Sequence, residues 1–411
     1  MLAVWLGLVP SGWGNERAGV VMDEVWGAVA KFHYDPGFAA KNRARLYDAY
    51  REEVLATEND AVLAEVLNRM LRQIGDSHIV LHPPPGVATD AVKKKLAEGM
   101  PLAAADGGFS VLNVGGRVLV NRVESGSGAA QAGLRPGDEI LAVDDVAIKP
   151  EEPIYPAWSY QARALLGHGE PGSLLKLKVK SGVETRELEF GRRANGGKFF
   201  QLGFMPRLAM VYESRMLDGD IGYVKFNLFA PEAVMAFRRD LRGKLAGAKA
   251  LVIDLRGNPG GLIDSAQWFV SWLSRNEINL GKLIVSGTTL ELKSTPQKRS
   301  FGGKLAILTD IDSASCAEIA AAAVQDAAAG KIVGGRTPEF CLPSQFIELP
   351  SGFHLQTVFG DGLRANGKRI EGVGVTPDIE APATPEDLAA GRDPALDAAL
   401  AELRRELESE K

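Results

Sequence analysis

Two short apolar runs in the second half of the chain each end in a turn that a helical segment follows, and this alternation most constrains the fold. Residues 250–255 lead into the glycine-rich turn 256–261, and residues 262–273 then have a helical pattern. Residues 304–310 lead into the serine-containing turn 312–319, after which an alanine-rich helix runs to Gly330. Buried strand, turn and helix form the repeating unit of an α/β layer, whose sites lie at the strand ends. The sequence therefore predicts such a layer from about residue 204 onward.

The second turn reads Asp-Ser-Ala-Ser-Cys-Ala-Glu-Ile and holds two serines, Ser313 and Ser315. A serine between a strand and a helix has an exposed hydroxyl, and the N–H groups of the first helical turn point toward any oxyanion that forms beside it. The alternative is that both serines only cap the helix, because serine is a favoured N-cap residue. This stretch alone leaves both interpretations open.

The first turn reads Arg-Gly-Asn-Pro-Gly-Gly. A phosphate-binding loop would need a lysine and a hydroxyl that are missing here, so nucleotide binding is disfavoured. The other use of such a turn is to bring a bare N–H of Gly260 or Gly261 close to a reacting carbonyl. Asp254 and Arg256 are better explained as structural residues that hold the turn than as chemical groups.

Composition excludes several classes of protein. The length of 411 residues allows two or three domains. The net charge of −5 and the pI near 5.7 argue against a nucleic-acid-binding protein. No apolar run approaches the roughly 18 to 20 residues needed to span a membrane. Cys316 and Cys341 are too few for a disulfide framework and are not spaced as a metal-binding pair.

Residues 1–9 are apolar but lack a basic segment before them. We interpret this stretch as the remnant of a signal peptide, with a first strand or packing segment as the alternative. A periplasmic or secreted location is therefore favoured over a cytoplasmic one.

Helical patterns cover much of residues 15–75, and Gly75 ends the last of them. The next residues are Asp76, Ser77 and His78, which lead into a strand expected at residues 79–82. The chain has five histidines, and only His78 lies in a tight polar junction with a neighbouring hydroxyl and carboxylate. It is therefore the candidate general base for a serine nucleophile.

Residues 102–192 have the pattern of a small β-rich module. The run GSGAAQAGLRPGDEILAVDDVAI is similar to the core of PDZ domains. That resemblance implies a loop whose N–H groups receive a peptide's C-terminal carboxylate, and a sheet edge to which the peptide adds a strand. The segment that corresponds to this loop is Gly107, Gly108, Phe109, Ser110 and Val111, although its glycines would also suit a hairpin. The helix beside the groove would span residues 156–166.

Almost the whole chain resembles the C-terminal-processing (tail-specific) serine peptidases, the family that also includes the core protease called tricorn. The matching segments, in the order of that family, are IGDSHIVL, the inserted PDZ-like module, GYVKF, LVIDLRGNPGG, DSASCAEIAAAAVQD and IEGVGVTPDIE. The resemblance implies that Ser315 is the nucleophile, in a Ser-x-x-Glu motif, and that Ser313 caps the helix.

One departure from the family pattern bears on the mechanism. Processing peptidases with a Ser/Lys dyad carry their lysine about 25 residues beyond the nucleophile, and Phe340 occupies that place here. The chain thus resembles the tricorn-like branch, in which a histidine from the N-terminal part is the base. On that resemblance His78 is the base, and Ser77 and Glu371 complete the tetrad. Their alternatives are a plain helix-end turn for Ser77 and a surface strand residue for Glu371.

The N–H groups of Gly260 or Gly261 and of Cys316 would then form the oxyanion hole, with no role for the thiol. The predicted fold class is multidomain α+β. It comprises an N-terminal helical domain (15–88), a PDZ-like domain (100–192), an α/β peptidase core (204–390) and a C-terminal helix (393–411). The resemblance implies that the core is a crotonase/ClpP-like β-spiral.

The function that follows from the resemblance is a serine endopeptidase. It would cleave unfolded or flexible polypeptides through an acyl-enzyme, with capture of substrate, C-termini included, by the PDZ module. No metal or organic cofactor is called for, and a homo-oligomer is left open. The alternatives are an inactive protein on the same fold that binds peptides or hydrophobic ligands, a Ser/Lys-dyad peptidase and, more distantly, a crotonase-like acyl-CoA enzyme, which the PDZ insertion disfavours.

Overall fold

The computed structural model describes residues 13–84, 105–148, 166, 169–194, 198–201, 203, 208–285 and 287–409. They belong to two compact units. The first unit comprises residues 1–98, 284–288 and 342–361, and the second comprises residues 99–283, 289–341 and 362–411.

The first unit begins with helices that occur where the sequence predicts them. They are α1 (Trp13–Phe32), α2 (Phe38–Asn42), the π-helix η1 (Ala44–Asp48), α3 (Ala49–Leu55) and α4 (Asp60–Arg72). Helix α4 is amphipathic because apolar residues recur three and four positions apart and all face the core. Its N-cap is Asn59, whose side chain accepts the N–H of Val62.

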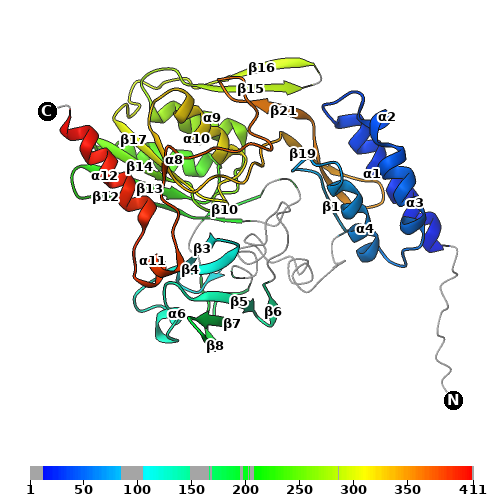
Figure 1. The fold of residues 1–411 in the computed structure, drawn as a ribbon, viewed down its shortest axis with the longest axis horizontal. Helices are drawn as coiled ribbons and strands as arrows, with labels where there is room; N and C mark the ends of the chain where they lie inside the picture. The colour runs from blue at the N-terminus through cyan, green and yellow to red at the C-terminus, as the bar shows by residue number, and fades with distance from the viewer. Residues whose placement is uncertain are drawn as a thin grey trace. The chain divides into compact units, whose positions relative to one another are not determined.

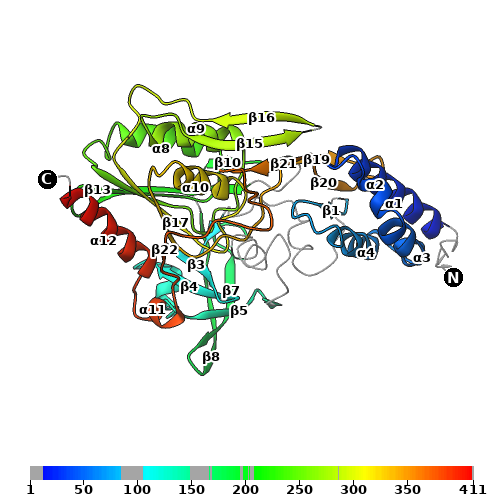
Figure 2. The same cartoon turned by 45° about the horizontal axis from the view of Figure 1, so that its top comes forward.

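An antiparallel sheet completes the first unit. Its strands are β1 (Val80–His82), β20 (His354–Val358) and β19 (Ser344–Glu348), in the order β1-β20-β19. Val80 pairs with Gln356 and His82 with His354. The sheet shares one core with α1 and α4, and β1 lies beside α4 (Figure 2). Strand β1, which begins two residues after His78, is thus held between a helix and a strand from far along the chain.

The second unit opens with the predicted β-rich module (Figure 1). Its elements are β2 (Ala105–Asp106), β3 (Phe109–Val114), β4 (Arg117–Val123), α6 (Gly128–Gln131), β5 (Glu139–Val143), β6 (Val146–Ala147), β7 (Leu174–Ser181), β8 (Glu184–Gly191) and β9 (Arg193–Ala194). Neighbouring strands are antiparallel in the order β3-β4-β5-β7-β8, and β6 pairs with β5. Strand β3 lies at one end of this order, as a peptide-accepting edge requires. The predicted helix 156–166 lies outside the described residues apart from residue 166.

The predicted α/β layer follows. Its six-stranded sheet has the order β12-β13-β14-β17-β18-β22, and all its strand pairs are parallel except β12–β13. The strands are β12 (Tyr212–Leu217), β13 (Ile221–Phe226), β14 (Ala250–Asp254), β17 (Lys304–Thr309), β18 (Lys331–Gly334) and β22 (Ile379–Glu380). Outside this sheet lie the pair β10 (Lys198–Phe200) and β11 (Leu208–Met210) and the sheet β16-β15-β21, with β15 (Asn279–Val285), β16 (Thr288–Lys293) and β21 (Gly360–Leu363).

Helices cover both faces of the six-stranded sheet (Figures 1 and 2). On one face lie α8 (Pro231–Leu241), α9 (Ile263–Leu273) and α10 (Cys316–Asp326), in the larger apolar core. On the other face lies α12 (Pro394–Glu408), which buries Ala395, Ala399 and Leu403. Successive residues of a strand point to opposite faces of the sheet. Leu305 of β17 accordingly packs with α10 and Ala306 with α12. The short helix α11 (Pro385–Ala389) precedes α12.

Candidate active site

The two turns singled out in the sequence lie side by side at the carboxyl ends of β14 and β17. The strands are parallel neighbours, with Asp254 level with Leu308. Two hydrogen bonds then tie the turns together: the N–H of Ala314 donates to the carbonyl of Asn258 (3.0 Å), and that of Gly257 to Oδ1 of Asp310 (3.0 Å). Parallel pairing therefore brings together two segments that are more than fifty residues apart in sequence.

Gly260 is in direct contact with Ser315. A Cβ atom at Gly260 would lie 2.7 Å from Cβ of Ser315 and 3.0 Å from the backbone nitrogen of Cys316. The φ of +105° at Gly260 is also one that side-chain-bearing residues rarely adopt. Glycine is therefore needed here both for the backbone conformation and for the close approach to the serine.

Ser315 has the strained backbone expected of a serine presented between a strand and a helix. Its φ is +54° and its ψ −117°, which is uncommon for any residue but glycine. It is the N-cap residue of α10. Its N–H lies 2.8 Å from the carbonyl oxygen of Phe340 and 3.0 Å from Oε2 of Glu318. The backbone of Ser315 is thus held from outside its own turn.

Ser313 does not cap the helix, so that prediction is wrong. Its side chain is fully buried, and its hydroxyl lies 3.0 Å from the carbonyl oxygen of Leu255 and accepts the N–H of Asp310 (2.9 Å). The N-cap position falls two residues later, at Ser315, because the turn needs the intervening residues to connect β17 to α10. Ser313 instead joins the serine turn to the end of β14.

Two backbone N–H groups beside Ser315 are candidates for an oxyanion hole. Those of Gly261 and Cys316 have no hydrogen-bond acceptor within the part of the chain that the structure describes, whereas the N–H of Gly260 donates to Oδ1 of Asn258 (2.9 Å). The thiol of Cys316 donates to the carbonyl oxygen of Gly261 (3.2 Å), which joins the start of α10 to the glycine turn. Burial raises the pKa of this thiol to about 12, so it stays protonated at neutral pH.

Glu371 is buried against the loop that holds Ser315. Its side chain is 7% exposed, and its Oε2 accepts the N–H of Cys341 (2.7 Å). The N–H of Gly372 donates to the carbonyl of Glu339 (2.9 Å). Phe340 lies between these two contacts, and its carbonyl accepts the N–H of Ser315. The structure therefore places Glu371 in the same unit as Ser315, one loop away from it.

Ser77 and His78 are in contact in the first unit. Oγ of Ser77 lies 2.6 Å from Nδ1 of His78. Burial lowers the pKa of His78 to about 4, so the imidazole is neutral at pH 7 and can accept a proton. The neighbouring carboxylate does not serve His78: Oδ2 of Asp76 is 2.7 Å from Nε2 of His33, and its Oδ1 accepts the hydroxyl of Tyr34. The hydroxyl of Ser77, and not the carboxylate of Asp76, is thus the group that contacts His78.

Sequence reasoning assigned no role to Glu318, which the structure places at the centre of the site. Its side chain is fully buried. Burial raises the pKa of its carboxyl to about 7, against the lowering by hydrogen bonds from Thr337 and from three backbone N–H groups. The Ser-x-x-Glu spacing is the signature of a capping box, and that signature could have identified this residue.

Asp254 and Arg256 form a buried ion pair under the glycine turn. Burial opposes ionisation of Asp254, but Arg256 and Lys225 outweigh it and hold the pKa of its carboxyl well below the usual value. The guanidinium of Arg256 also donates to both oxygens of Asp393, the N-cap residue of α12 (2.7 and 2.8 Å). These contacts fit the structural role expected from the sequence.

The predicted peptide-binding loop leads into the edge strand β3. Gly107 and Gly108 lie between β2 and β3, and Phe109, Ser110 and Val111 form the first half of β3. Gly108 has a φ of +76°, and a Cβ there would lie 2.3 Å from Cβ of Ser127. Its N–H donates to Oδ1 of Asp106 (2.8 Å). The glycines are therefore required for packing, and one of the loop's N–H groups already has an acceptor.

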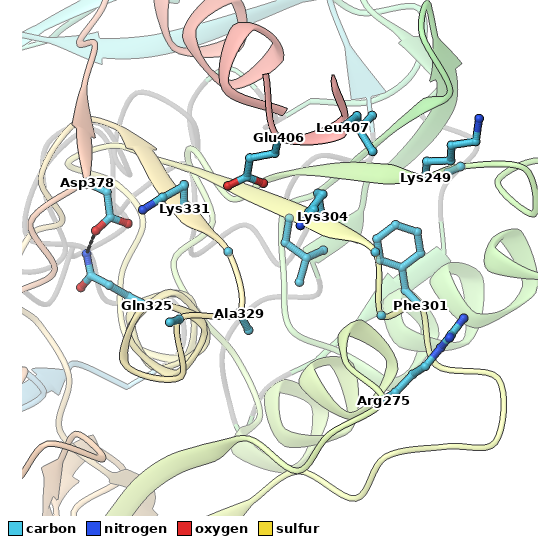
Figure 3. A pocket seen from close by; sticks show the side chains of 16 residues that line it. Lys249, Arg275, Phe301, Lys304, Gln325, Ala329, Lys331, Asp378, Glu406 and Leu407 are labelled. Carbon is cyan, nitrogen blue, oxygen red and sulfur yellow. Dashed lines mark hydrogen bonds between the residues drawn. The ribbon is translucent and has the colours of Figure 1, made fainter. Parts of the chain in front are cut away.

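A cavity of about 670 Å³ lies at the opposite end of the sheet strands from Ser315. It is at the amino-terminal ends of β17 and β18, where Lys304 and Lys331 lie on either side of Glu406 (Figure 3). Asp378 also lines it and accepts a hydrogen bond from Gln325 (3.1 Å). Its basic residues are thus interspersed with acidic ones. In the described ranges, no cluster of metal-ligating side chains occurs, and no helix is long and apolar enough to cross a membrane.

Comparisons with known proteins find relatives for the peptidase-like and the β-rich parts of the chain. Residues 220–381 match the family model of peptidase family S41, and residues 105–190 match that of the PDZ domain. The chain is 24% identical over 328 residues to the carboxy-terminal processing protease CtpA of Bacillus subtilis (strain 168), which covers 79% of this chain and 65% of that protein. It is 28% identical over 364 residues to tricorn protease homolog 1 of Streptomyces coelicolor (strain ATCC BAA-471 / A3(2) / M145), covering 86% of this chain and 32% of that protein.

Among solved structures, the photosystem II D1 C-terminal processing protease superposes with a TM-score of 0.58 at 21% identity, covering 92% of this chain and 98% of that one. This likeness concerns the fold. The chain spans 65%, 50% and 65% of the lengths of the first three curated relatives that it matches.

The described chain is a mixed α and β fold with an inserted β-rich module. More particularly, the chain carries a peptidase family S41 domain and a PDZ domain. The resemblance to C-terminal-processing and tricorn-like peptidases is confirmed.

Proposed function

We propose that this chain is a serine endopeptidase whose nucleophile is Ser315. The observation that carries the proposal is that a serine with a strained backbone begins α10 beside two N–H groups that lack an acceptor in the described part of the chain, those of Gly261 and Cys316. N–H groups at this place stabilise negative charge that develops on the carbonyl oxygen of the scissile bond. Helix capping alone does not require the contact between Ser315 and Gly260.

The reaction then follows the usual course of acyl transfer. His78 takes the proton from the hydroxyl of Ser315 as Oγ attacks the carbonyl carbon of the peptide bond. The oxyanion is held by the N–H groups of Gly261 and Cys316. On collapse the amine leaves with the proton from His78, and water, deprotonated by the same imidazole, hydrolyses the ester. Of the two glycines considered from sequence, we assign Gly261, because the N–H of Gly260 is engaged by Asn258.

His78 is neutral at pH 7 and can therefore accept a proton, while the burial that lowers its pKa to about 4 also makes it a weaker base than an ordinary histidine. If Nδ1–H donates to Oγ of Ser77, Nε2 is left as the proton acceptor, so Ser77 selects the tautomer. Glu371 would complete the tetrad from its buried position beside Cys341. A lysine base is disfavoured, because Lys331 begins β18 and lines the cavity at the far end of the sheet.

The substrates we propose are unfolded or flexible polypeptides. PDZ domains bind extended peptides at an edge strand of their sheet, and β3 is an edge strand in the described strand order. Two of the relatives are named for processing at carboxyl termini, which favours capture of C-termini here as well. For the peptidase core we propose the crotonase/ClpP-like spiral, and for the domains the boundaries 15–88, 100–192, 204–390 and 393–411.

The test compares wild type with Ser315→Ala on an unstructured protein such as casein. Loss of the nucleophile should reduce turnover by about a millionfold, and a fluorophosphonate should label the wild type at Ser315 only. Undiminished cleavage by Ser315→Ala would end the proposal. A wild type that binds peptides but neither cleaves nor is labelled would establish the inactive binding protein instead. Full activity in His78→Ala would point back to a lysine base.

A further inference from the structure

Glu318 is bonded to four donors that come from two separate segments. Its Oε2 accepts the N–H of Ser315 (3.0 Å) and that of Phe340 (3.0 Å). Its Oε1 accepts the hydroxyl of Thr337 (2.6 Å) and the N–H of Glu339 (3.1 Å). Each oxygen thus receives two hydrogen bonds, and the carboxylate links the nucleophile turn to the loop 337–340.

We propose that Glu318 is the positioning residue of the active site, whose carboxylate holds Ser315 and the loop 337–340 in the geometry that presents the nucleophile. The inference rests on the proposed function, because it assigns a partner to the same serine. Glu318 acts through the backbone of Ser315 and does not itself contact the substrate.

The backbone conformations at both ends of this link support the proposal. Among the described residues, six other than glycine have a positive φ, and Ser315 (+54°) and Glu339 (+74°) are two of them. Both donate their N–H to Glu318. Residues in this region persist only where the surroundings hold them, and such residues gather at active sites. One buried carboxylate therefore restrains two strained residues that are more than twenty positions apart.

The chemistry of the four contacts requires a carboxylate. All four partners donate, so the group that receives them must be an acceptor at both oxygens. Hydrogen bonds to an ionised acceptor are about twice as strong as neutral ones, so the four donors favour the carboxylate, against the burial that raises its pKa to about 7. The position of Glu318 in the first turn of α10 adds the favourable interaction of a negative charge with a helix N-terminus. A glutamine has the same size but would point an NH₂ group at one pair of donors.

The bonds to Glu318 also give a role to Phe340, which stands where the dyad enzymes have their lysine. Phe340 uses its backbone instead: its N–H donates to Glu318, and its carbonyl accepts the N–H of Ser315. The next residue, Cys341, donates its N–H to Glu371. Glu318 thereby fixes a loop that is bonded to both Ser315 and Glu371, so loss of its carboxylate would disturb both residues.

The decisive experiment compares Glu318→Gln with Glu291→Gln at pH 8, above the pKa of about 7 of the Glu318 carboxyl. The control also removes one negative charge, but Glu291 is an exposed residue of β16, outside the loop 337–340. We expect kcat of Glu318→Gln to fall on the order of 100-fold, because a misplacement of about 1 Å costs that much. KM should stay within about twofold, and the rate of fluorophosphonate labelling at Ser315 should fall in parallel with kcat. Glu291→Gln should match wild type in all three.

A purely structural role for Glu318 would lower stability and leave kcat of the folded protein unchanged, and that result would overturn the proposal. If Glu318→Gln does not fold, the pair Thr337→Val and Thr337→Ser replaces it. The valine removes a hydroxyl that donates to Glu318 and accepts the N–H of Val375, and the serine restores it. We expect kcat to fall in the valine variant and to recover in the serine variant, and equal rates would contradict the inference.

Failure of the proposed function would be seen separately, in a wild type that neither cleaves nor is labelled. In that case amide hydrogen exchange at Ser315 and Phe340 still tests the positioning role. Exchange should accelerate at both amides in Glu318→Gln and not in Glu291→Gln. Unchanged exchange would refute the role of Glu318 whatever the activity of the protein.

Discussion

Replacement of Gly260 by alanine tests the contact on which the site depends. The new Cβ would lie 2.7 Å from Cβ of Ser315, where ordinary contact begins at 3.4 Å, so the two groups must separate by 3.4 − 2.7 = 0.7 Å. The backbone nitrogen of Cys316 at 3.0 Å prevents a simple sideways shift. A displacement near 1 Å in an active site costs about 100-fold in rate. We therefore expect kcat of Gly260→Ala to fall by roughly two orders of magnitude.

The substitution also strains the backbone, since φ at Gly260 is +105°. Such a conformation costs on the order of 1–3 kcal/mol for a residue with a side chain. Gly367→Ala is the matched control, because Gly367 also has a positive φ (+82°) but has nothing within 4 Å of the added atom. Both variants should lose stability in a urea titration, and only Gly260→Ala should lose activity.

The assay is hydrolysis of an unstructured protein, with kcat and KM measured well below the unfolding midpoint of each variant. Full activity in a folded Gly260→Ala would refute the assigned geometry. An equal loss of activity in Gly367→Ala would show that backbone strain, and not the approach to Ser315, is responsible.

Further predictions concern Cys316, Leu388 and His78. Iodoacetamide at pH 8 should leave activity unchanged, because burial raises the pKa of the Cys316 thiol to about 12; inactivation with alkylation at Cys316 would contradict this. Leu388→Ala should lower the free energy of unfolding in urea by about 2–5 kcal/mol, because Leu388 of α11 is buried against Leu112 of the PDZ domain. Truncation of the half-exposed Leu290 should lower it little. Protonation of the Glu318 carboxylate, whose pKa burial raises to about 7, should lower kcat/KM between pH 8 and 6, and protonation of His78, whose pKa is lowered from 6.5 to about 4 by burial, should lower it further only toward pH 4. The lowered pKa of His78 also contributes on the order of 3 kcal/mol of stability above pH 6.5, which is lost as the pH falls toward 4. Wild type should therefore lose more stability between pH 7 and 5 than His78→Gln. An equal loss in the two proteins would contradict this prediction.

Local pattern was sufficient to predict most of the secondary structure around the site. Helix α9 (Ile263–Leu273) begins one residue after the start of the helical pattern at residues 262–273 and ends with it. The strands β14 and β17 are continuous apolar runs because both of their faces are covered by helices. These features depend on residues close together in sequence, which is why they can be read directly.

Local pattern was not sufficient for hydrogen-bond partners. Ser313 has the residue type of a helix cap, yet its hydroxyl contacts Leu255, a residue of another strand end. Asp76 adjoins His78 in sequence, yet its carboxylate contacts His33. In both cases the polar group could bond to several partners and is bonded to one that lies close in the folded chain. The spacing of residues along the chain does not predict which partner that is.

Residue patterns were enough to predict the α/β layer and the β-rich module and to name the candidate serine, histidine and glutamate. The packing of segments far apart in sequence was needed to show that the N–H of Gly261, and not that of Gly260, lacks an acceptor in the described chain, and that Glu318 joins Ser315 to the loop around Phe340. The physical reason is that apolar periodicity follows from the burial of one chain segment at a time. The satisfaction of a buried polar group, by contrast, depends on every segment packed around it.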